Sequence, residues 1–130
     1  MFLEPLPPHS VITPIVGRVR AALAEMQARE PAGDLEKRAR DARPVRDFEG
    51  AVAGGFGLIA EIKRTSPSMG TMRNADVADT ADAYEHSPAV RAVSVLTNRE
   101  DFGMSLDQLG VVGARTAKPL LRKEIGRAHV

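Results

Sequence analysis

Cysteine is absent from this sequence of 130 residues, which excludes a disulfide framework and any metal site built on thiolates. Long hydrophobic runs are also missing, and the longest ones are far too short to cross a bilayer. Neither sign of charge dominates, because 18 Lys and Arg residues stand against 17 Asp and Glu residues. This balance gives no electrostatic reason to expect a nucleic-acid or an acidic-membrane partner.

The three histidines, His9, His86 and His129, share no ligand spacing, so we expect no metal site, and we expect no cofactor. The first ten residues contain two adjacent prolines and an acidic residue where a signal peptide would carry basic charge. We therefore expect a cytoplasmic protein with no membrane partner. A hydrophobic fraction of 43% is enough for the core of one ordinary domain.

Residues 1–45 are expected to form an extension that contains an amphipathic helix. Thr13 followed by Pro14 is typical of a helix start, with the threonine as N-cap. Apolar residues then recur at helical spacing at Ile15, Val19, Ala22, Leu23 and Met26. The charge-dense stretch 34–43 that follows is either a short solvated helix or a surface loop.

Strands and helices alternate after this extension. Apolar and β-branched runs predict strands at 58–63, 90–97 and 119–123. Helical periodicity predicts crossover helices at 75–87 and 105–115. A helix-sized connection between successive strands indicates an α/β fold with a parallel sheet.

The stretch 58–70, LIAEIKRTSPSMG, is the most informative part of the chain. Alternation along a strand places Ile59, Glu61 and Lys63 on one face. The opposite face takes Leu58, Ala60 and Ile62. The apolar flanks predict burial on both faces, as in parallel sheets. Buried charges are costly unless they are paired or used, so Glu61 and Lys63 are functional candidates, with an ordinary same-face ion pair as the alternative.

Three motifs lie in order between about Arg46 and Glu124: AEIKRTSPSMG, AVSVLTNREDFGMSLDQL and KPLLRKE. Together they resemble the first three strand-and-loop units of the indole-3-glycerol-phosphate synthase family of tryptophan biosynthesis. The resemblance implies the N-terminal part of a TIM (β/α)8 barrel, with about three parallel strands after an extra helix. It also implies a carbon-carbon lyase, which closes the indole ring of 1-(2-carboxyphenylamino)-1-deoxyribulose 5-phosphate with loss of carbon dioxide and water.

The resemblance also implies roles for five residues. Lys123 matches the acid beside the substrate carbonyl, Lys63 matches the ammonium that meets the substrate carboxylate, and Glu61 would orient Lys63 and assist proton transfer. Ser66 matches a substrate contact, and Phe102 matches an aromatic residue that lines the substrate's ring pocket. From the residues alone, Lys123 is more simply a solvated lysine at a strand end and Phe102 a core residue. The implied partner is a small phosphorylated anion.

The C-terminal end departs from the family pattern. Glu124 and Ile125 stand where the family usually has Asp-Phe, and Met104 stands where glycine is more usual. The last six residues, IGRAHV, match the translation of a common sequencing adapter, ATC GGA AGA GCA CAC GTC. We therefore hypothesise that 125–130 is an adapter-derived tail behind a barrel segment at 46–124. Resequencing the locus tests this, and an in-frame native stop after Val130 would defeat it.

A complete barrel of this type takes roughly 250 residues and eight strands. We therefore expect this chain to be inactive by itself, with further catalytic groups and most of the phosphate site supplied by later strands. A fused or associated tryptophan-pathway domain is compatible with the resemblance. One alternative is another phosphate-binding barrel such as phosphoribosylanthranilate isomerase, which the run EIK followed by SPS disfavours. The other is a non-catalytic fragment that self-associates through open strand edges.

Overall fold

The computed structural model describes residues 10–72 and 76–124. The described residues fall into two compact units, one within 10–44 and the other within 45–124. The proposed adapter tail, 125–130, lies outside the described residues. Within the described part, no helix is both long and apolar enough to traverse a bilayer.

The first unit contains two helices, α1 (Ile12–Arg29) and α2 (Ala32–Arg40). Helix α1 begins one residue before Thr13, so the predicted N-cap is wrong. Val11 takes the N-cap position without a side-chain capping bond, and the Ser10 hydroxyl accepts the Ile12 N–H at 3.2 Å. Helix α2 confirms the helical alternative for the charge-dense stretch. None of the described residues of either helix is buried.

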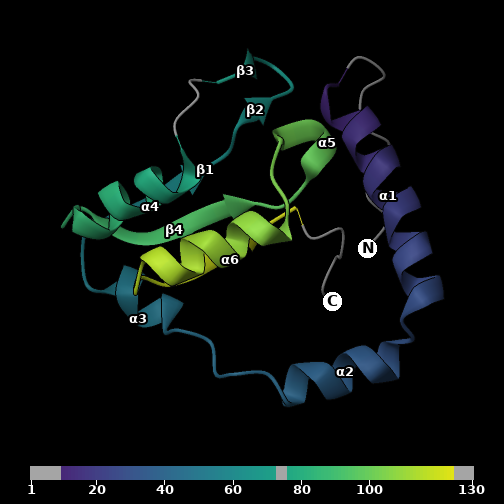
Figure 1. Ribbon diagram of the computed structural model, residues 1–130, viewed down its shortest axis with the longest axis horizontal. Coiled ribbons are helices and arrows are strands. Elements are labelled where there is room, and N and C mark those ends of the chain that lie inside the picture. Colours follow the sequence, from purple (N-terminus) through teal and green to yellow (C-terminus); the bar gives the residue numbers. More distant parts are fainter. Residues whose placement is uncertain (1–9, 73–75, 125–130) are drawn as a thin grey trace. The chain divides into compact units, whose positions relative to one another are not determined.

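The second unit is a three-stranded parallel sheet with helical crossovers (Figure 1). Its strands are β1 (Leu58–Ile62), β4 (Val90–Leu96) and β5 (Leu120–Lys123), in the order β1-β4-β5. Its longer helices are α4 (Val77–His86) and α6 (Leu106–Arg115), and a short helix α3 (Phe48–Ala53) precedes β1. The predicted alternation of strand and helix is confirmed.

The core of this unit lies where α4 and α6 pack on the sheet. It is formed mainly by Ile62, Val77, Ala81, Val93, Val95, Leu96, Met104 and Val112, all nearly or fully buried. Helix α4 starts where Asp76 accepts the N–H groups of Ala78 and Asp79, as expected of an N-cap. Met104 is fully buried, so the residue that departs from the family pattern serves as core packing.

Burial of β1 on both faces, predicted from its apolar run, is wrong for the first half of the strand. Leu58 and Ile59 are each 48% exposed, whereas Ile62 is 4% exposed. Within the described sheet β1 is an edge strand that pairs only with β4, so its first residues lack neighbours on one side. Leu106, at the start of α6, is likewise 55% exposed.

Two small elements follow the strands and were not predicted. A hairpin of β2 (Thr65–Ser66) and β3 (Gly70–Thr71) follows β1, and a one-turn helix α5 (Arg99–Phe102) follows β4. The two loops are joined by hydrogen bonds from the Arg64 N–H to the Phe102 carbonyl and from the Thr65 hydroxyl to the Asp101 carbonyl, both at 3.1 Å. The candidate substrate-binding segments thus support one another.

Candidate active site

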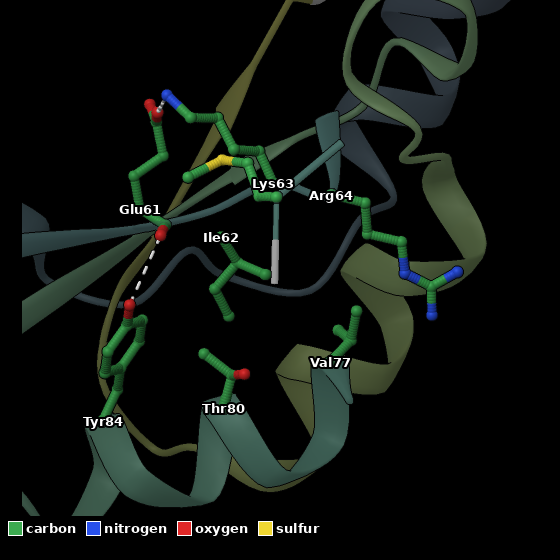
Figure 2. Close-up of a pocket in the computed structure, with 8 residues that line it drawn as sticks. Glu61, Ile62, Lys63, Arg64, Val77, Thr80 and Tyr84 are labelled. Atoms are coloured by element: carbon green, nitrogen blue, oxygen red, sulfur yellow. Dashed lines mark hydrogen bonds and ion pairs between the residues drawn. The ribbon is translucent and has the colours of Figure 1, made fainter. Parts of the chain in front are cut away.

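Glu61 lies near the carboxyl end of β1 and is held from two directions (Figure 2). On the α4 side, the Tyr84 hydroxyl donates to the Glu61 backbone carbonyl at 3.4 Å. Ile62 points toward α4, as the alternation of a strand requires, and it joins the buried core. The Glu61 side chain therefore projects from the face of the sheet opposite to α4.

The Glu61 carboxylate binds two ammonium groups, one with each oxygen. Lys63 Nζ lies 2.9 Å from Oε1, and Lys123 Nζ lies 2.7 Å from Oε2. Since Lys123 belongs to β5 and Glu61 to β1, the second ion pair spans the central strand β4. The structure therefore brings together all three residues that were predicted to be catalytic.

The electrostatics of Glu61 follow from this arrangement. The Glu61 side chain is 27% exposed, and this partial burial by itself raises the pKa of the carboxyl. Hydrogen bonds from Lys123 and Lys63, with the attraction of both positive charges, outweigh that effect and hold the pKa of Glu61 below its usual value. Glu61 is therefore ionised at neutral pH.

Lys123 is fixed through its main chain by a residue that the sequence did not single out. The carbonyl of Lys123 accepts the Thr97 N–H at 3.0 Å and the Thr97 hydroxyl at 2.8 Å. Arg122 Nε in turn donates to the Thr97 hydroxyl at 3.3 Å. In the sequence, Thr97 is marked only as a hydroxyl residue directly after a predicted buried strand. Its contact with Lys123 becomes visible only when β5 is placed beside β4.

Ser66 and Phe102 lie outside this charged cluster. The Ser66 hydroxyl lies 3.1 Å from that of Ser68, within the loop of the hairpin. Phe102 is partly buried and packs against the core. Among the interactions of the described residues, none joins Ser66 or Phe102 to Glu61, Lys63 or Lys123, so their substrate contacts stay predictions.

A pocket of about 320 Å³ opens beside the end of β1. It is lined by Glu61, Ile62, Lys63, Arg64, Met72, Val77, Thr80 and Tyr84. Figure 2 shows the pocket between the end of β1 and helix α4. Thr80 and Tyr84 were not predicted as site residues, because a helical spacing of four positions is just as typical of residues that only pack against a sheet. Within the described residues, no group of three His, Cys, Asp or Glu side chains is placed to hold a metal ion.

A parallel sheet with helical crossovers and charged side chains at its carboxyl edge defines the class: this is the first part of a TIM (β/α)8 barrel. The sequence model described as "Indole-3-glycerol phosphate synthase" matches residues 12–125. The chain belongs to this family. The predicted fold class and resemblance are confirmed, and the isomerase alternative is not favoured.

Curated relatives agree with this assignment. The protein named "Indole-3-glycerol phosphate synthase 1" from Streptomyces coelicolor is 45% identical over 117 residues, which cover 88% of this chain and 43% of the relative. The synthase of Saccharopolyspora erythraea is 41% identical over 118 residues, and that of Mycobacterium sp. (strain KMS) is 40% identical over 117 residues, with the same coverage of each chain. The chain thus spans less than half the length of these relatives.

Proposed function

We propose that the protein to which this chain contributes is a cytoplasmic carboxy-lyase that closes the indole ring of 1-(2-carboxyphenylamino)-1-deoxyribulose 5-phosphate. The product is indole-3-glycerol phosphate, with release of carbon dioxide and water. The observation that carries the proposal is the convergence of Lys63 and Lys123 on the single carboxylate of Glu61, at 2.9 Å and 2.7 Å. Two ammonium groups at the carboxyl edge of the sheet suit a substrate whose carboxylate is bound by one of them and whose carbonyl oxygen is protonated by the other.

The proposed division of labour follows the positions of these groups. Lys123 donates a proton to the substrate carbonyl oxygen as the aromatic ring attacks the carbonyl carbon. Lys63 binds the substrate carboxylate and assists when the hydroxyl leaves as water. Glu61 holds both ammonium groups in place before the substrate arrives and takes part in the return of protons. Such preorganisation lowers the cost of aligning the reacting groups.

We further propose that 46–124 forms the first three βα units of the barrel and that 1–45 is an extension to it. The chain alone is expected to be inactive, because three strands leave the site open on the side where later strands of a barrel would stand. Open edges of this kind also expose unpaired backbone groups. The molecular mass of the purified chain in solution should therefore be measured alongside any activity assay, to detect self-association through these edges.

A chimeric enzyme tests the function. Residues 12–124 of this chain replace the aligned segment of the Streptomyces coelicolor relative, whose remaining part supplies the later strands. The chimera is expected to form indole-3-glycerol phosphate and to restore growth of a tryptophan auxotroph. A folded chimera without activity would contradict the proposed function.

Variants of the chimera test the roles. Lys123→Met is expected to lower kcat by about 100-fold or more, the usual size of a general-acid contribution. Lys37→Met removes the same charge from an exposed position on α2 and is the matched control. An active chimera in which both variants behave alike would show that Lys123 is not the acid.

A further inference from the structure

Ser94, in the middle of β4, carries a hydroxyl that packing does not explain. Its side chain is 4% exposed, and its Oγ has no hydrogen-bond partner among the described residues. A buried, unpaired hydroxyl destabilises a fold, whereas alanine or valine at this place would avoid that cost. The neighbours Val93 and Val95 are fully buried residues of the kind a central strand favours.

The sheet register places Ser94 beside the charged cluster. Ser94 pairs with Glu61 on β1 and with Leu121 on β5. Paired residues of a parallel sheet project from the same face, so Ser94 shares the face of Glu61. The ion pair between Lys123 and Glu61 crosses β4, the strand that carries Ser94.

Glu61 already has two charged partners while the lysines are bound to it. Each of its oxygens accepts one ammonium group, from Lys63 and from Lys123. In the proposed reaction both lysines must turn to the substrate instead, Lys63 to its carboxylate and Lys123 to its carbonyl oxygen. A carboxylate that loses its partners in a partly buried place is destabilised unless another donor replaces them. Ser94 is an uncharged donor on the same face, one strand away.

We propose that Ser94 is a positioning residue whose hydroxyl donates a hydrogen bond to Glu61 when Lys63 and Lys123 turn to an anionic substrate. This inference rests on the proposed function and adds the group that holds Glu61 in the loaded site. Only hydrogen bonds are exchanged in this step. Besides the two lysines, the Tyr84 phenol faces Glu61 from α4, where it binds the main-chain carbonyl, and β4 adds no charge on this face.

A double-mutant cycle on the chain itself tests the proposal without any substrate. Lys63→Met withdraws one lysine, as the substrate would, and the side-chain carboxyl of Glu61 is followed by carbon NMR as the pH is varied. Ser94→Ala is expected to leave the titration midpoint of Glu61 nearly unchanged in the parent chain. In the Lys63→Met chain it should raise the midpoint by about one pH unit, the size of one hydrogen bond to a charged acceptor. Ser94→Thr, which keeps the hydroxyl, should restore the lower midpoint.

Equal effects of Ser94→Ala in both backgrounds, or none in the Lys63→Met chain, would overturn the proposal. Ser87→Ala, at the end of α4, is the control for a serine lost elsewhere. If Lys63→Met does not fold, Lys123→Met withdraws the other lysine in the same cycle. A chimera that folds but is inactive would refute the proposed function without changing the outcome of this cycle. In an active chimera, absence of coupling would refute the role of Ser94 alone.

Discussion

Arg46 provides the sharpest test of what holds the second unit together. Its Nη1 donates to the carbonyls of Thr116 at 2.7 Å and Lys118 at 2.8 Å, and its Nη2 donates to the carbonyl of Gly113 at 3.0 Å. These carbonyls belong to the last turn of α6 and to the segment that leads into β5. The C-terminal end of a helix leaves carbonyls without partners and carries partial negative charge. The single guanidinium of Arg46 therefore provides hydrogen bonds to three carbonyls and a positive charge near the end of α6.

The size of the effect follows from the exposure of these bonds. A hydrogen bond to a charged donor contributes about 1.5–3 kcal/mol when it is shielded from water. Two of the three bonds are solvent-exposed, so they are expected to contribute only about 0.5 kcal/mol each, as surface ion pairs do. Because the bond to Thr116 is only part-buried, its contribution lies at the lower end of that range. Arg46→Met should therefore lower the free energy of unfolding by about 2.5 kcal/mol, a large share of the stability of a small domain.

Urea unfolding of the chain, followed by far-ultraviolet circular dichroism, measures this loss. Arg46→Lys keeps the charge but cannot reach three carbonyls with a planar fork, so an intermediate loss is expected. Arg43→Met removes an exposed arginine three positions earlier and is the matched control. If Arg46→Met stayed within about 0.5 kcal/mol of the parent chain, as ordinary surface changes do, the reasoning on these carbonyls would be refuted.

Three further predictions concern the site and its loops. Because the pKa of Glu61 is held below its usual value, its contribution to stability is present above the pKa of the unfolded chain and is lost as the pH falls through the folded pKa. Unfolding curves of the parent chain and of Glu61→Gln should thus differ more at neutral pH than in strong acid, and a constant difference would contradict this. Gly103 has a φ of +67°, and a Cβ there would lie 3.1 Å from the Cβ of Arg64, so Gly103→Ala should cost about 1–2 kcal/mol in thermal unfolding. An unchanged melting temperature would show that the turn relaxes freely. Tyr84→Phe removes a bond of 3.4 Å and should cost at most about 1 kcal/mol by urea unfolding; a larger loss would mean that the phenol has other essential partners.

Sequence periodicity predicted the second unit well because each of its elements is long enough to show a pattern. The strand at 58–63 and the helix at 105–115 were each placed within one or two residues of the observed bounds. The hairpin of Thr65–Ser66 and Gly70–Thr71 escaped prediction, since two-residue strands show no alternation. Exposure of Leu58 was missed because burial of a strand depends on neighbours that its own residues do not encode.

The clustering of the candidate catalytic residues could be predicted for a different reason. Glu61 and Lys63 lie two positions apart in the predicted strand 58–63, so alternation alone placed them on the same face. Lys123 joined them only through the family resemblance, since no local pattern relates positions so far apart in the chain. Ser94 and Thr97 were overlooked because their significance lies in register and hydrogen bonding, which appear only after β1, β4 and β5 are aligned.

The carboxylate shared by two strands also constrains how this sequence can evolve. A substitution of Glu61 leaves both ammonium groups without their carboxylate, whereas a substitution of either lysine leaves one ion pair intact. Reversal of the charges would need three substitutions together, each of them harmful until the others are made. In sequences descended from this gene, the three positions should therefore be retained or replaced together and not vary independently.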